Sequence, residues 1–223
     1  HSDSRCADPV INGLVRPSLA FKSLRKYNGR IVNFLRCKYQ MKTLEESIDA
    51  LMTRYKENVP VRYTEYVEEW NSPIYGTVID ENTVEWTPCR QPEALNFDDL
   101  ESALEMSFHQ SIKTLFGRWY AGDLALDYQG HTISLLQTQS AEDGERLLEN
   151  ITGHILMKRR LKQPETVFIG LGSEDDGLLV TIDNQSGAVG LEWVGKEQHD
   201  VLSDSLAAWL DNCQPQVETD KNS

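Results

Sequence analysis

The sequence predicts an α+β fold, a single domain in which helices flank a mixed, mostly antiparallel sheet. Two observations indicate this. Short apolar or alternating segments come in neighbouring pairs joined by tight turns, as in β-hairpins. Longer segments between them repeat apolar residues every three or four positions, which is the period of amphipathic helices. Because hairpins outnumber helical crossovers, most neighbouring strands should run antiparallel.

The first 40 residues differ in charge from the rest of the chain. They contain eight Lys or Arg and two Asp, a charge of +6, whereas the remaining 183 residues contain 14 basic and 33 acidic groups, a charge of −19. Pro and Gly interrupt this leader, and no secretory signal pattern is present in it. We expect residues 1–40 to be a disordered or non-native upstream extension. The alternative is a basic arm that contacts anionic lipid or the acidic body.

The domain itself is expected at 41–215, and its first half predicts mainly helices. The elements are a helix that begins after Thr43, a good N-cap, and ends at Pro60, a short helix at 63–70, a hairpin of 77–79 with 83–86, and a helix at 97–116. The short helix rests on apolar residues spaced i, i+3, i+4 and i+7. That spacing places Glu65, Glu68 and Glu69 together on its other face.

The second half of the domain has the clearest pattern. It predicts strands at 122–128 and 131–137 with a turn at Gln129–Gly130 between them, a helix at 141–161, strands at 166–171, 178–182 and 187–193, and a last helix at 200–212. In the first strand, alternation puts Asp123 and Asp127 on the face turned to water. Ser140 is placed to cap the long helix, with Asp143 three residues later as in a capping box. Residues 216–223 are expected to form a loose polar tail.

The acidic body excludes some classes of partner. It repels nucleic-acid phosphate and suits anionic lipid poorly, while it attracts basic protein surfaces; the alternative is that the acidity only maintains solubility. No apolar run approaches the roughly 18 residues that span a bilayer. The four cysteines have no paired spacing, which argues against a disulfide framework or a zinc site and fits a reducing compartment.

We find no pattern of residues that predicts catalysis. Asp123 and Asp127 with His131 across the turn have oxygen and nitrogen ligands for a divalent cation, but a solvated strand face explains them equally well. His154, in the middle of a helix, is expected to be a packed, hydrogen-bonded residue. The basic cluster at 158–162 follows the helix dipole. We therefore expect no catalytic residue, no metal and no cofactor.

Several segments resemble, in matching order, those of the Syd family of bacterial SecY-interacting proteins. They are Ala121–Asp123, Leu135–Thr138, Glu149–His154, Lys158–Lys162, Phe168–Ile169 and Asn184–Gly187. The similarity runs from about Met41 to Pro215. It implies a non-catalytic protein, peripheral on the cytoplasmic face of the inner membrane. Such a protein docks through an acidic surface on basic cytosolic loops of the translocon subunit SecY, and restrains or sequesters improperly complexed SecY.

Acidic residues from separate elements are the candidate partner-binding positions, provided that they converge on one surface. They are Glu65, Glu68, Glu69, Asp123, Asp127, Glu174, Asp175 and Asp176. The resemblance supports Asp123 and the turn 174–176 most directly. Two other functions remain open: an immunity-type module that neutralises a basic protein toxin, and a metal-dependent hydrolase that uses Asp123, Asp127 and His131.

Overall fold

The computed structural model describes residues 42–172 and 177–217. Its helices are α3 (Leu44–Asn58), the 3-10 helix η2 (Glu68–Trp70), α4 (Asp98–Leu104), α5 (Gln110–Phe116), α6 (Ala141–Arg160) and α7 (Leu206–Asn212). Its strands are β1 (Tyr63–Glu65), β2 (Tyr75–Asp80), β3 (Thr83–Trp86), β4 (Cys89–Arg90), β5 (Trp119–Tyr120), β6 (Leu124–Tyr128), β7 (His131–Leu135), β8 (Thr166–Gly172), β9 (Leu178–Asp183), β10 (Val189–Trp193), β11 (Asp200–Ser203) and β12 (Gln214–Pro215). The basic leader lies outside the described residues.

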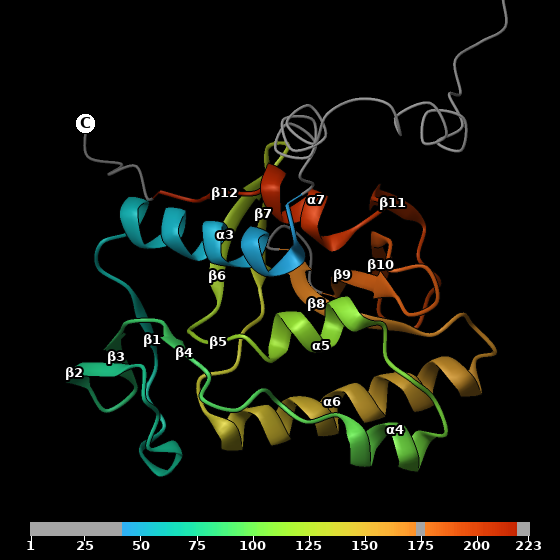
Figure 1. Ribbon diagram of the computed structural model, residues 1–223, viewed down its shortest axis with the longest axis horizontal. Coiled ribbons are helices and arrows are strands. Elements are labelled where there is room, and N and C mark those ends of the chain that lie inside the picture. Colours follow the sequence, from blue (N-terminus) through green and yellow to red (C-terminus); the bar gives the residue numbers. More distant parts are fainter. Residues whose placement is uncertain (1–41, 173–176, 218–223) are drawn as a thin grey trace, which may run out of the picture. The chain divides into compact units, whose positions relative to one another are not determined.

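A seven-stranded sheet forms the centre of the domain, in the order β11-β10-β9-β8-β7-β6-β12. Every neighbouring pair in it is antiparallel. In Figure 1, α3 and α7 lie across the upper part of this sheet, near β12 and β11, and α6 and α4 lie below its strands. Smaller antiparallel sheets contain β1, β3 and β2, and β4 with β5. The predicted α+β class, with a mostly antiparallel sheet flanked by helices, is confirmed.

The apolar core lies between the large sheet and its helices. Alternation holds in β6, where Leu124, Leu126 and Tyr128 are buried. The fully buried Trp209 of α7 packs on the Tyr128 ring, with 5.8 Å between ring centroids. Ile151 of α6 is also fully buried. Burying each such side chain stabilises the fold by roughly 1.5–3 kcal/mol. Helices that cover both faces of the sheet therefore stabilise it, because each face carries apolar side chains.

Helix caps form where the sequence predicts them. Thr43 and Glu46 make a reciprocal capping box at the start of α3. The Ser140 hydroxyl accepts a hydrogen bond from the Asp143 backbone N–H at the start of α6. The Asp143 carboxylate, however, accepts from the backbone N–H of Gln139 and not from that of the cap residue. Each cap satisfies N–H groups that the helix itself leaves unpaired.

The predicted helix at 97–116 is wrong as a single element. The chain breaks after α4, where Glu105 adopts a left-handed conformation with φ 51°, and α5 begins after His109. The linker is held by side chains: the Glu101 carboxylate accepts from the Phe108 N–H, and Asn184 accepts from the His109 N–H. These contacts hold the linker in a non-helical conformation, although the apolar residues keep a helical spacing through it. Both short helices still bury their apolar residues.

Two other helix predictions are corrected by long-range strand pairing. Residues 63–65 form β1 on β3, and only the 3-10 helix η2 follows, so the three glutamates do not share one helical face. The last helix is shorter than expected, because residues 200–203 pair with β10 as β11. Of the predicted tail, Gln216 donates its N–H to the Ala125 carbonyl beside β12. Residues 218–223 lie outside the described chain. The local spacing of apolar residues does not show with which distant strand a segment will pair.

Candidate partner-binding site

Asp123 lies just before β6, where the chain entering this strand meets the segment that follows β7. Its carboxylate accepts a hydrogen bond of 2.8 Å from the Gln137 backbone N–H. Asp123 is exposed to solvent, but the protein atoms around its carboxyl group remove part of its hydration. This desolvation raises the pKa of Asp123 to about 6, with a smaller contribution from the charge of Asp143, against the lowering effects of the Gln137 N–H and of Arg146. Asp123 is therefore an acid whose charge changes just below neutral pH.

Asp127 lies four residues further along β6. It is half-buried, and its carboxylate accepts from the N–H of Gly130 in the β6–β7 turn. Gln129 and Gly130 have φ values of 54° and 85°, the left-handed pair that a tight two-residue hairpin turn requires. Four steps along a strand span about 13 Å, so Asp123 and Asp127 mark opposite ends of β6.

The glutamates of β1 and η2 lie toward the Asp123 end. Glu65, Glu68 and Glu69 are all exposed. Next to them, the Trp70 ring lies 4.8 Å from the guanidinium of Arg146, a residue of α6. Arg146 also donates to the carboxylate of Asp143, whose charge acts on Asp123. The structure therefore brings Asp123 and η2 to the same end of α6, and sequence reasoning missed Arg146 because its partner is 76 positions away in the chain.

The acidic turn 174–176 lies outside the described residues. Gly172, just before it, pairs with Ile133 of β7. The described acidic positions therefore form two groups: Asp123 with Glu65, Glu68 and Glu69 near the start of α6, and Asp127 at the other end of β6.

The proposed metal ligands do not converge. His131 lies opposite Tyr128, next to Asp127, but Asp123 is at the far end of the strand. Within the described part of the chain, no three His, Cys, Asp or Glu side chains gather closely enough to hold a metal ion. The geometry does not favour metal-dependent hydrolysis by this set.

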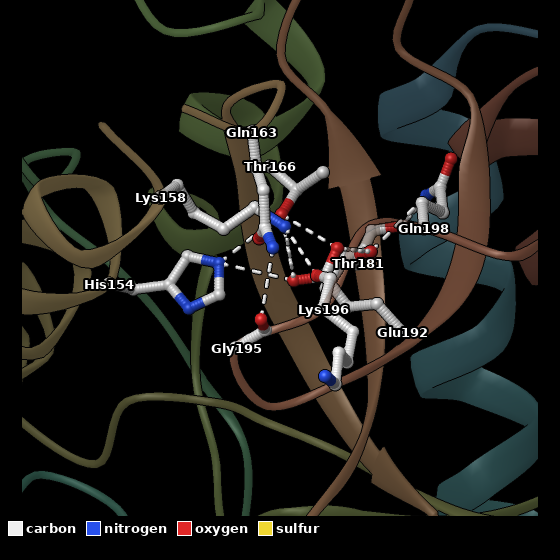
Figure 2. Close-up of polar contacts among 9 residues, drawn as sticks. All are labelled: His154, Lys158, Gln163, Thr166, Thr181, Glu192, Gly195, Lys196 and Gln198. Atoms are coloured by element: carbon white, nitrogen blue, oxygen red, sulfur yellow. Dashed lines mark hydrogen bonds and ion pairs between the residues drawn. The ribbon is translucent and has the colours of Figure 1, made fainter. Parts of the chain in front are cut away.

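A buried polar network under the sheet was only partly expected (Figure 2). His154 is buried and lies 3.2 Å from the Thr166 hydroxyl, as the prediction of a packed histidine requires. Lys158 does lie in the last turn of α6, where a basic cluster that follows the helix dipole is expected, but it also has a partner that the sequence does not predict: it is fully buried, and its Nζ donates to Glu192, also fully buried, at 3.2 Å. Thr181 donates to the same carboxylate. The signal was available, because Lys158 is seven residues after the buried Ile151 and shares its helix face.

This network contains one strongly stabilised carboxylate. Burial alone would raise the pKa of Glu192, but hydrogen bonds from His154 and Thr166 and the charge of Lys158 hold it below its usual range. The cluster joins α6 to β8, β9 and β10 and has no access to water at its centre. Its role is to position the helix on the sheet.

Comparison with known proteins identifies the family. The family model described as "Syd protein (SUKH-2)" matches residues 40–215. This chain belongs to the Syd family. It is 39% identical over 180 residues to Protein Syd of Pseudoalteromonas atlantica, covering 78% of this chain and 96% of that relative. It is 43% identical over 144 residues to Protein Syd of Pseudoalteromonas translucida, covering 64% and 80%. Protein Syd of Alteromonas mediterranea is 36% identical over 176 residues, covering 78% of this chain and 97% of the relative.

The Syd-family match spans every element of the described fold, from α3 to β12. In the described ranges, 42–172 and 177–217, no helix is both long and apolar enough to cross a bilayer.

Proposed function

We propose that this chain is a non-catalytic binding protein that docks on basic cytosolic loops of the SecY translocon subunit. It regulates or sequesters SecY that is improperly complexed. The observation that carries the proposal is membership of the Syd family over residues 40–215. The charge of −19 on residues 41–223 supports it, because an acidic surface speeds encounter with a basic partner. Membrane association then occurs through the partner, on the cytoplasmic face, and nucleic acid is not bound.

The binding surface in this proposal contains the acidic positions already named. Among the described residues these are Asp123 with Glu65, Glu68 and Glu69, and, at the other end of β6, Asp127. The turn Glu174–Asp176 is included on the basis of the sequence alone. A single exposed ion pair contributes about 0–1 kcal/mol, so binding requires several charges acting together. This dependence makes the interaction sensitive to salt.

Co-purification with SecY-containing membranes tests the proposal. We expect recovery of the protein with SecY to fall as salt rises, and the triple variant Glu174→Lys, Asp175→Lys, Asp176→Lys to lose it. The matched control reverses three exposed carboxylates on other elements, Glu57, Glu93 and Glu149, and so has the same net charge. Circular dichroism checks that both variants fold. Binding that ignores salt, or is lost equally in the control, contradicts docking through these positions.

An immunity-type module remains the second candidate, and the same protein tests it. Tighter binding to a basic soluble toxin than to SecY membranes would favour that function. An acidic surface attracts either basic partner, so surface charge does not distinguish the two functions.

A further inference from the structure

A recess lies at one end of the seven-stranded sheet. Its apolar wall contains Tyr128, Ile133, Leu178, Leu191 and Leu202, and its volume is about 250 Å³. Polar residues also line it: Gln129, His131 and Thr132 of the β6–β7 hairpin, and the exposed Asp200 at its rim. We call it the sheet hollow. Ile133 and Tyr128 are buried, and the three leucines are half-buried, so the surface is apolar but reached by solvent.

Strand register explains why these side chains meet. Directly opposed residues of antiparallel strands share a face, and Leu191 opposes Asp200 while Leu178 opposes Trp193. Glu192, the next residue along β10, points to the other face, where it meets α6. The sheet hollow is thus on the face opposite α6.

A glycine leaves room in this wall. Gly172 of β8 lies opposite Ile133 and lines the sheet hollow. A Cβ at this position would lie 3.0 Å from the Leu178 side chain, so a side chain here would fill part of the recess. Trp193, 40% exposed beside Leu178, extends the apolar surface at its margin.

The size and charge of the sheet hollow indicate its occupant. Small-molecule pockets usually measure about 300–1,000 Å³, so this recess suits one large side chain better than a cofactor. Asp200 is exposed, and its carboxylate makes no hydrogen bond or ion pair with another described residue. An apolar wall with a carboxylate at its rim complements an apolar side chain that has a Lys or Arg next to it.

We propose that the sheet hollow binds an apolar or aromatic side chain within a basic peptide segment of the partner, while Asp200 pairs with the adjacent cation. The inference rests on the proposed function and deepens it. Exposed ion pairs are individually weak, whereas a side chain buried at the centre of an interface supplies most of its binding energy. The sheet hollow supplies such an anchor point for a partner that the acidic charge attracts.

Methyl NMR of the full chain tests this with two synthetic peptides, acetyl-Lys-Arg-Phe-Lys-Arg-amide and the same peptide with Ala in place of Phe. We expect the Phe peptide to shift the methyl signals of Ile133, Leu178, Leu191 and Leu202. It should also bind about 10-fold or more tightly than the Ala peptide, since burying a Phe ring is worth roughly 1.5–3 kcal/mol. Asp200→Asn should weaken binding of the Phe peptide by up to about fivefold, the upper limit for one exposed pair.

The control variant is Asp204→Asn, an exposed carboxylate just beyond β11, which should leave the affinity unchanged. Leu178→Gln, checked for folding by its amide spectrum, should remove the preference for Phe over Ala. Equal affinity for the two peptides, without methyl shifts, overturns the proposal that the sheet hollow binds an apolar side chain. It leaves electrostatic docking on SecY intact. If the protein fails to bind SecY in the membrane assay but still binds the Phe peptide more tightly than the Ala peptide, only the proposed partner is wrong.

Discussion

Lys158 and Glu192 form an ion pair of 3.2 Å in which both side chains are fully buried. The Lys158 ammonium also donates to the Lys196 carbonyl at 2.7 Å, and the carboxylate accepts from Thr166 and Thr181 (Figure 2). Two charges without water require such complete hydrogen bonding, because the desolvation of each costs several kcal/mol. The pair therefore fixes how α6 lies on the sheet.

Removing one member of this pair should be strongly destabilising. We expect Lys158→Met to lower the free energy of unfolding by about 3–5 kcal/mol, because it leaves Glu192 buried without its cation. Adding Glu192→Met should recover part of the loss. Urea denaturation of the two single variants and the double variant measures this as a double-mutant cycle. Strictly additive losses would show that the two charges do not interact.

Asp123 should make stability depend on pH. Its folded pKa of about 6 lies above the ordinary value of 3.8, so its ionisation disfavours the folded state. The stability associated with protonated Asp123 is present below about pH 4 and lost as pH rises through 6. Asp123→Asn keeps an acceptor for the Gln137 N–H and should therefore melt at a higher temperature than the wild type at pH 7, with no difference at pH 4. Thermal unfolding at both pH values checks this, and a constant difference would contradict it.

Asp49 should show the opposite dependence. Arg118 donates to its carboxylate from two nitrogens and Trp119 from its ring N–H, which lowers the pKa of Asp49 to about 2. The stabilisation is present above pH 3.8 and lost as pH falls toward 2. We expect Asp49→Asn to lower the free energy of unfolding by about 1–2 kcal/mol at pH 7, since the pair is partly exposed. Urea titrations at pH 7 and pH 3 should show a smaller effect at the lower pH.

Two glycines should respond in opposite directions to alanine. A Cβ at Gly122 would lie 2.8 Å from the Trp86 ring and 3.2 Å from the Thr64 Cβ, so Gly122→Ala should displace the segment that positions Asp123 and destabilise the protein by about 1–3 kcal/mol. A Cβ at Gly153, inside α6, meets nothing within 4 Å, so Gly153→Ala should stabilise by roughly 0.5–1 kcal/mol. Melting temperatures of the two variants check this. A higher melting temperature for Gly122→Ala would contradict the close packing at Gly122, and a lower one for Gly153→Ala would contradict the open space at Gly153.

Much of the fold was predictable because its signals are local. The Thr43 and Ser140 caps, the 129–130 turn and the alternation in β6 each depend on residues a few positions apart. The prediction of one helix at 97–116 failed because its break depends on two contacts that helical periodicity does not show, from Glu101 to Phe108 and from the distant Asn184 to His109. Strand β11 was missed because its partner, not its own pattern, makes it a strand.

The candidate site shows the same division. Composition alone determined that the body is acidic, since charge is a sum over residues and needs no coordinates. Only the tertiary structure decided that Asp123 lies near η2 and that Asp127 lies at the other end of β6. The burial of Lys158 against Glu192 and the sheet hollow also required it. The physical reason is that desolvation and side-chain proximity arise from contacts between distant segments, whereas helix caps, turns and periodicity act within a single turn or strand.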